Sequence, residues 1–220
     1  MLLALGQLER EAKQRLAQPS GAPMGRKQFL RLLGGTATAI GLIVTAQSPA
    51  LARSEHAQAS AWVEANMQNL PRTYDEICKL AMPYRKAIHR VLSPQEKARA
   101  WVDHFQWYRA THPDLTAPHQ QVVDRAIEVF RRGLAPRPGL EEDLRHLERT
   151  AKATLGLDEA GALLATLGAA EDMSAAQNCN CSTVSDHCGW LYDCGRQIRC
   201  TVIPNDCGTG WHYDCNGICY

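Results

Sequence analysis

The chain has 220 residues, and its 24 basic and 23 acidic side chains leave a formal net charge of +1 at neutral pH. Eight of its nine cysteines lie in the last fifth of the sequence, between Cys179 and Cys219. From Gln177 to Tyr220 acidic residues outnumber basic residues by two. This stretch therefore lacks the basic footprint of a nucleic-acid-binding protein and the cationic character of a peptide that attacks anionic membranes by electrostatics. We expect no nucleic-acid partner.

The N-terminal part has the order of a secretory signal. Residues 1–23 are polar, and we interpret them either as an extended N-terminal region or as residues upstream of a true start at Met24. A basic stretch, Gly25–Arg31, follows and precedes fifteen uncharged, mostly apolar residues from Leu32 to Ala46. This run is shorter than the roughly 20 apolar residues that span a bilayer, so a signal peptide over 24–52 is favoured over a permanent anchor.

Small residues at Ala50 and Ala52 form an A-x-A cleavage site, so signal peptidase is expected to cut between Ala52 and Arg53. The stretch from Arg26 to Leu30 resembles the twin-arginine export signature with lysine in place of one arginine. The twin-arginine and the general secretory routes therefore both remain open. Either route predicts a secreted, extracytoplasmic protein.

Residues 53–168 read as a helical pro-domain, a small bundle. Thr73 and Glu76 form one capping box, and Ser93 and Glu96 form a second, with proline at the first helical position. His112-Pro113-Asp114 breaks a helix, and a last alanine-rich helix covers 158–168. Apolar residues recur at helical spacing in each segment: Trp62, Val63, Met67 and Leu70; Ile77, Leu80 and Met82; Trp101, Phe105 and Tyr108; Val122, Val123, Ala126, Ile127 and Phe130; Leu140, Leu144, Leu147 and Ala151.

Residues 169–178 carry small and polar side chains without periodicity. This is linker composition, and exposed linkers are where proteases cut. We expect a processing protease to cleave near Ala176–Gln177.

The last segment, 179–220, is predicted to be a disulfide-stapled module. Zinc knuckles need paired Cys-x2–4-Cys units, and only Cys215 and Cys219 have that spacing, without a second knuckle to match. We therefore favour four disulfides, which such a short segment needs because it cannot bury enough apolar surface. Eight cysteines allow 105 connectivities, and all of them remain open. The cysteines are Cys179, Cys181, Cys188, Cys194, Cys200, Cys207, Cys215 and Cys219.

Within the module we expect a small β-meander. Residues 198–203 and 211–215 alternate enough to be strands, and Asn216-Gly217 is typical of a two-residue hairpin turn.

The sequence predicts neither a catalytic site nor a cofactor, and we expect a protein that is not an enzyme. Cys78 with His89 or His104 lacks any sign of an oriented third group, so we interpret Cys78 as a buried structural thiol outside the disulfides. Ser185, Asp186 and His187 are consecutive, so their side chains diverge and do not form a triad.

Aromatic residues are the module's candidates for recognition. Trp190, Tyr192, Trp211 and Tyr213 are candidates for a binding surface, because amphipathic aromatics on a rigid frame suit recognition of a protein, glycan or membrane interface. The alternative is that they only cover the disulfides. The expected partner is a component of a target-cell surface or a membrane interface.

The tail also resembles a known family. Its pattern, with Asn178-Cys179-Asn180-Cys181, the sequence C-G-T-G-W over 207–211 and C-N-G over 215–217, is similar to fulvocin C, a small disulfide-bridged bacteriocin of myxobacteria. Residues 70–94, including Leu70-Pro71-Arg72 and Met82-Pro83-Tyr84, resemble the region shared by fulvocin C-related proteins. The resemblance implies an antibacterial peptide released from a precursor.

We therefore interpret the chain as an exported precursor whose module acts by binding. A rival interpretation is an uncleaved secreted or surface protein with a stapled adhesion module. A cytosolic metal-binding regulator is a third interpretation, and it would require that no signal peptide is present. We also expect the helices to stay folded when the disulfides of the tail are reduced.

Overall fold

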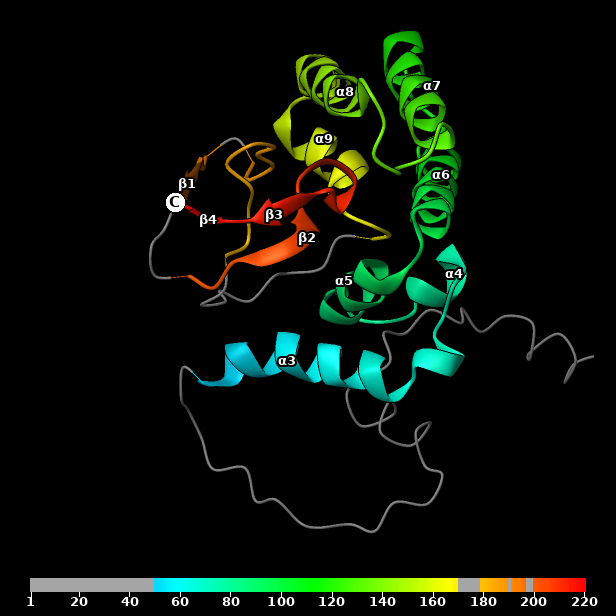
Figure 1. Ribbon diagram of the computed structural model, residues 1–220. Helices are drawn as coiled ribbons and strands as arrows, with labels where there is room; N and C mark the ends of the chain where they lie inside the picture. The colour runs from blue at the N-terminus through cyan, green and yellow to red at the C-terminus, as the bar shows by residue number, and fades with distance from the viewer. Residues whose placement is uncertain (1–49, 170–178, 190, 197–199) are drawn as a thin grey trace, which may run out of the picture. The chain divides into compact units, whose positions relative to one another are not determined.

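The computed structural model describes residues 50–169, 179–189, 191–196 and 200–220 (Figure 1). All of them belong to one compact unit, Gln47–Tyr220. The predictions for residues 1–49, for the cleavage pair Ala176–Gln177 and for Trp190 lie outside the described residues. The expected signal-peptidase site, Ala52–Arg53, lies in the first turns of the first described helix.

Seven α-helices make up most of the described part of the chain up to residue 169, as predicted. Within the described ranges no helix is both long and apolar enough to cross a membrane. The helices are α3 (Ala50–Ala65), α4 (Tyr74–Ile77), α5 (Met82–Val91), α6 (Pro94–Thr111), α7 (Ala117–Arg131), α8 (Leu140–Leu155) and α9 (Leu157–Leu164), with a 3-10 turn at Met67–Asn69.

Local signals fix where these helices begin and end. The backbone N–H of Ser93 donates to Glu96 Oε2 at 2.8 Å, and the N–H of Glu96 donates to Ser93 Oγ at 3.3 Å, so the predicted capping box is formed. The box at Thr73 and Glu76 is also present. Gly156 has a φ of 85°, which turns the chain between α8 and α9.

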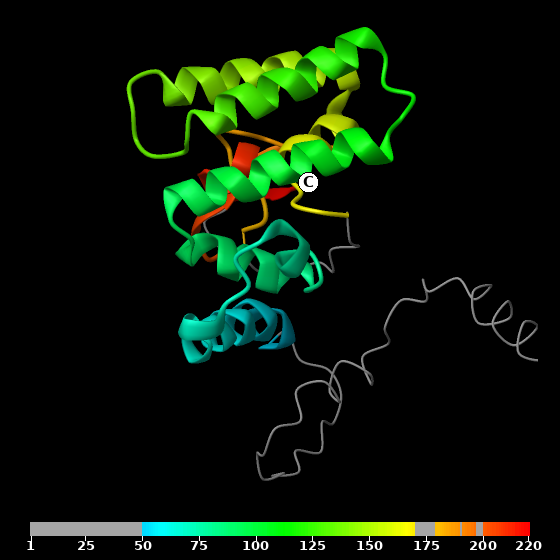
Figure 2. The ribbon, with the colours of Figure 1, turned by 90° about the vertical axis from the view of Figure 1, so that its right-hand side faces the viewer.

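The helices pack as a chain of neighbours. Figure 2 shows α6, α7 and α8 side by side, and α9 packs on α8 while α3 packs on α5. Trp101, Phe105 and Phe130 are fully buried between α6 and α7 and form the aromatic centre of the core. The predicted stripes of α6 and α7 therefore face one another, whereas Met67 of the first predicted stripe is 47% exposed.

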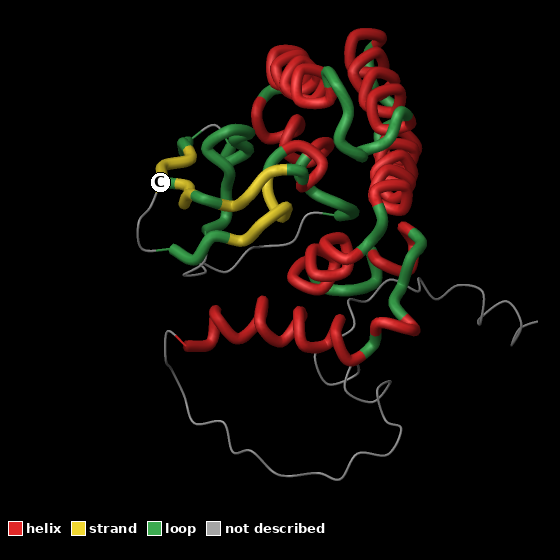
Figure 3. Tube along the Cα trace, viewed as in Figure 1, coloured by secondary structure: helices red, strands yellow, loops and turns green. Residues whose placement is uncertain are grey.

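The C-terminal module contains two small antiparallel sheets, drawn yellow in Figure 3. Strand β1 (Cys194–Arg196) pairs with β4 (Gly217–Cys219), and β2 (Ile203–Cys207) pairs with β3 (Tyr213–Cys215). A 3-10 turn, η2 (Thr209–Trp211), joins β2 to β3. The predicted fold class, a helical region followed by a small disulfide-rich β module, is confirmed.

The strand order differs from the expected meander. Asn216-Gly217 is not a hairpin turn, because β4 pairs with β1 rather than with β3. The Asn216 side chain instead accepts a hydrogen bond from the backbone N–H of Thr183 at 2.9 Å. A Cβ atom at Gly217 would lie 2.7 Å from the Cys194 sulfur, so this glycine permits close strand approach beside a disulfide.

Four disulfides join the eight cysteines of the module. Three of them join residues at least 13 positions apart, and Cys207–Cys215 closes the shortest loop, with a sequence separation of 8. Cys78 is outside these disulfides, and its sulfur lies 3.9 Å from the carbonyl oxygen of Leu167. The pairs are Cys179–Cys200, Cys181–Cys194, Cys188–Cys219 and Cys207–Cys215.

Candidate functional site

The aromatic residues expected on one surface are divided between two environments. Tyr192 is 54% exposed, whereas Trp211 is 1% and Tyr213 is 8% exposed. Trp211 and Tyr213 are therefore covered in the intact chain, and the binding surface expected for a released module stays a prediction. Both side chains belong to the apolar core of the helices, because the module packs against α5, α8 and α9.

We call the interface between the module and helices α5, α8 and α9 the seam. Trp211 is its central aromatic residue. Its ring meets the rings of His89 and Trp101 edge-on, with centroid separations of 5.1 Å and 5.4 Å. The Lys86 ammonium lies 5.5 Å from the centre of the same ring. The indole N–H donates to the carbonyl oxygen of Ala165 at 2.7 Å. A buried indole with its N–H satisfied contributes a large apolar area at no polar cost.

The module positions this indole with a tightly turned loop. The disulfide Cys207–Cys215 brackets the loop, and Gly208 and Gly210 have φ values of 70° and 67°. Trp211 itself has a φ of 50°, which is uncommon for a residue with a side chain. A Cβ atom at Gly210 would lie 2.6 Å from the Phe130 ring, so glycine is required for the loop to reach the helices.

Asp206 forms the charged part of the seam. Its carboxylate, 1% exposed, accepts from Arg90 at 2.7 Å and lies 3.5 Å from the Lys86 ammonium. Lys86 also donates to the backbone carbonyl of Asp206 at 2.8 Å. Burial opposes ionisation, but Lys86, Arg90 and His56 outweigh it and hold the pKa of Asp206 below its usual value. The module is thus held to α5 by a buried ion pair.

A second polar network ties the module to α8. Glu148 on α8 accepts hydrogen bonds from the hydroxyls of Ser185 and Thr209. Lys152, one turn further along, donates to Glu148 at 2.6 Å and also contacts the backbone carbonyl of Asp186. Because Glu148 is buried and these partners satisfy it, the network fixes the register of the module on the helix.

These polar groups do not form a catalytic triad. Ser185 donates to Glu148, while the backbone amides of Cys188 and Cys194 donate to the Asp186 carboxylate. His187 Nε2 lies 3.1 Å from the Thr209 hydroxyl, and desolvation lowers the pKa of this histidine to about 4. The predicted divergence therefore holds for Asp186 only, because Ser185 and His187 both contact Thr209 and Glu148.

The histidines that could activate Cys78 are held neutral by the core. Desolvation lowers the pKa of His89 to about 3 and that of His104 to about 4. His89 Nε2 accepts the Trp101 indole N–H at 3.2 Å, and His104 lies against the Gly168 amide and the Ala162 carbonyl. Both side chains have structural partners.

Metal binding by the cysteines is disfavoured by their oxidation. The sulfurs of Cys181, Cys188 and Cys219 lie within 4.8 Å of one another. Each belongs to a disulfide, however, and zinc requires thiolates.

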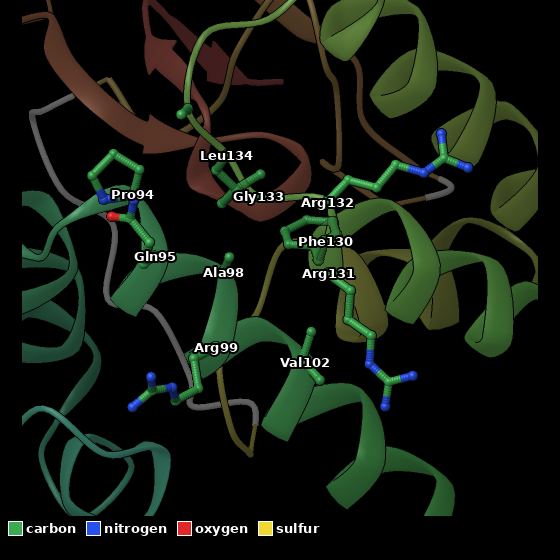
Figure 4. Close-up of a pocket in the computed structure, with 11 residues that line it drawn as sticks. Pro94, Gln95, Ala98, Arg99, Val102, Phe130, Arg131, Arg132, Gly133 and Leu134 are labelled. Carbon is green, nitrogen blue, oxygen red and sulfur yellow. The ribbon is translucent and has the colours of Figure 1, made fainter.

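Two of the cavities on the described surface are large enough and placed so as to bear on the site. A pocket of about 410 Å³ between α6 and the end of α7 has an apolar floor that includes Ala98, Val102 and Phe130. Figure 4 shows the side chains of Arg99 and Arg131 directed away from its centre, so it offers no convergent polar groups. The larger cavity, about 790 Å³, follows the seam between α9 and the module and has Trp211 in its wall.

Sequence reasoning did not find the partners of Trp211 and Asp206. The cations Lys86 and Arg90 lie on a helix more than a hundred residues upstream, with separations of 120 and 116 positions. Glu148 on α8 is buried, but nothing in the sequence distinguishes it from a solvent-exposed glutamate. The one available signal was the pair of glycines around Thr209, which indicates close approach of backbone to a neighbour.

The fold and the seam define a helical protein that carries a four-disulfide C-terminal β module. Over 44 residues, one-fifth of this chain, the sequence is 50% identical to the bacteriocin fulvocin-C of Myxococcus fulvus, and this stretch covers 98% of that protein. Through this region the chain belongs to the fulvocin C family. No family model matches the chain, and no solved structure matches it.

Proposed function

We propose that the chain is an exported precursor of a bacteriocin-like, disulfide-rich antibacterial peptide, in which the helices restrain the module until it is cut free. The observation that carries this proposal is the extent of the match: 44 residues cover 98% of a bacteriocin. The matched stretch is nearly the whole of that bacteriocin. In this chain the same stretch is only one-fifth of the sequence. We assign export and restraint to the remaining residues.

The contacts of the seam support restraint. Trp211 and Asp206 are both 1% exposed, and α5 supplies the two cations that pair with Asp206. Arg85 donates to the carbonyls of Leu167 and Ala169, so the helices also hold the chain where the linker over 170–178 begins. A cut near Ala176–Gln177 would separate the module covalently while leaving the seam to dissociate by itself.

Four disulfides support an extracytoplasmic location, because such bonds persist in oxidising compartments. We propose signal peptidase and a processing protease as partners, with a component of the target-cell surface or membrane interface as the receptor. N-terminal sequencing of the exported protein should give Arg53 as the first residue. Full-length protein confined to the cytosol would contradict export.

The function is tested by growth inhibition. A site for a specific protease is introduced within residues 170–178, and the uncut chain, the cut chain and the cut and reduced chain are applied to a panel of related bacteria. The proposal predicts that only the cut, oxidised chain inhibits growth. Equal inhibition by uncut and cut chains would contradict restraint.

One observation favours a second candidate, an uncleaved secreted or surface protein that uses the module for adhesion. Trp211 fills part of the helical core, so the module is integrated with the helices rather than loosely appended. Under this function the exposed Tyr192 would contact the partner, and no cut would be needed. Binding of the uncut chain to cell surfaces, with no inhibition by any form, would favour it.

A further inference from the structure

We propose that the face of the module that carries Trp211 and Asp206 also binds its target. The structure points to a protein target whose cleft accepts an indole beside two cationic side chains. This inference rests on the proposed function, because it concerns the module after it has left the helices. The same face would then bind either the helices or the target, but not both at once.

Trp211 is directed out of the module. The module has an apolar cluster of its own, formed by Cys179, Cys200, Cys207 and Cys215 with Ile203 and Ile218 packed against it. Trp211 belongs instead to the core of the helices. In the described part of the chain its aromatic and cation contacts come from His89, Trp101 and Lys86. Departure from the helices therefore uncovers the indole without emptying the module's own centre.

The module holds this indole in place from within. The backbone N–H of Trp211 donates to the carbonyl of Gly208 at 3.0 Å, and that of Asn205 donates to the Asp214 carboxylate at 3.0 Å. The disulfide Cys207–Cys215 closes the loop that contains the first of these bonds, and the second joins the two strands next to that disulfide. A tryptophan held on a rigid loop loses little entropy on binding, and such residues are the usual anchors of protein interfaces.

The charge beside the anchor selects the kind of partner. The carboxylate of Asp206 has Lys86 and Arg90 as ion-pair partners, and both lie on α5. After release this carboxylate loses both partners and is able to pair with other cations. An anionic lipid surface would repel it, whereas a protein cleft with lysine or arginine at its rim would replace what α5 provided. The helices thus show which groups a target has to offer.

The rival face of the module is the one left open in the intact chain. Leu191 and Tyr192 are 61% and 54% exposed there, and Tyr192 also lies at the edge of the cavity between α9 and the module. They need no release to contact a partner, so their role is separable from that of Trp211 by mutation.

The test uses the full chain with the protease site introduced in 170–178, and the chain is cut before each measurement. The first readout is the concentration that halves growth of a susceptible strain. The second is the fraction of fluorescently labelled module that binds to cells of that strain. The variants are Asp206→Asn, Trp211→Phe and, for the open face, Tyr192→Ala. Asp193→Asn removes a carboxylate from an exposed position of the same module and is the matched control. Intact mass verifies the four disulfides of each variant.

Asp206→Asn gives the sharpest result, because the two roles of the face predict opposite effects. The substitution weakens the ion pair that holds the module on α5. If this face only binds the helices and not the target, the variant should inhibit growth at the same concentration as wild type or at a lower one. Our proposal predicts instead that inhibition and cell binding each fall at least tenfold. Trp211→Phe should behave in the same way, while Asp193→Asn stays within about twofold of wild type.

Three outcomes would overturn the inference. The first is full potency of Asp206→Asn together with loss of potency in Tyr192→Ala, which would assign binding to the open face. The second is binding of the wild-type module to protein-free vesicles of anionic phospholipid as strongly as to cells, which would make the target a membrane. The third is a cut wild-type chain that neither inhibits nor binds any strain, which would refute the proposed function itself and this inference with it.

Discussion

The indole of Trp211 meets the indole of Trp101 edge-on, with ring centroids 5.4 Å apart and planes at 81°. One ring comes from the disulfide-stapled module and the other from the centre of α6. Edge-to-face pairs of this kind stabilise beyond their buried area. The pair therefore makes the module part of the helical core, and the stability of the two parts should be linked.

The first prediction concerns Trp211→Ala. Truncating a fully buried tryptophan leaves a cavity, and we expect the free energy of unfolding of the whole chain to fall by about 3–5 kcal/mol. Urea unfolding followed by far-ultraviolet circular dichroism measures this loss. Tyr192→Ala, at an exposed position, is the control and should stay within about 0.5 kcal/mol of wild type. Equal stability of both variants would show that Trp211 does not fill the core in solution.

Reduction of the disulfides gives a second prediction. The sequence suggested that the helices would not respond, but a disordered module would withdraw Trp211 and Asp206 from the seam. We now expect the helical melting temperature to fall when reductant is added, with helical signal retained below the new transition. An unchanged melting temperature would restore the earlier expectation of two independent parts.

The disulfides should differ in their contribution. By the chain-entropy relation, a closed loop of 8 residues stabilises by roughly 2.5 kcal/mol and one of 31 residues by roughly 3.7 kcal/mol. Replacing both cysteines of Cys188–Cys219 by alanine should thus cost more stability than replacing those of Cys207–Cys215. Growth inhibition should show the reverse order, because Cys207–Cys215 holds the loop that carries Trp211.

Stability should also depend on pH through the buried histidines. Desolvation holds the pKa of His89 at about 3 and the pKa values of His104 and His187 at about 4. Unfolded histidine titrates near 6.5, so below that pH the unfolded chain binds more protons than the folded one. The free energy of unfolding should be greatest above about pH 6.5 and fall toward pH 4, by about 1.4 kcal/mol per pH unit for each of these histidines.

Substitution at single histidines checks this assignment. His104→Gln should lower the slope of unfolding free energy against pH between 6 and 4.5 by up to about 1.4 kcal/mol per pH unit, the share of one histidine, while His56, whose pKa burial also lowers, still contributes. His146→Gln, at an exposed position of α8, should leave the slope as it is in the wild type. A flat profile in the wild type would mean that these side chains are solvated.

The helices were predictable because their signals are local. The Ser93–Glu96 capping box and the stripe Trp101, Phe105 and Tyr108 each lie within a few residues, and the structure contains both. The seam was not predictable, because it depends on pairs such as Lys86 and Asp206, which are 120 positions apart. Asn216 was misinterpreted for a related reason: its amide contacts Thr183, 33 positions away, rather than forming a local turn.

The central claim is that the helices restrain the module through Trp211 and Asp206. Its most direct test is dissociation of the cut, oxidised chain, measured by sedimentation over a dilution series. Breaking a buried ion pair costs about 3–5 kcal/mol, so Asp206→Asn should raise the dissociation constant by more than a hundredfold relative to Asp193→Asn. Identical dissociation constants for Asp206→Asn, Trp211→Phe and wild type would contradict the claim.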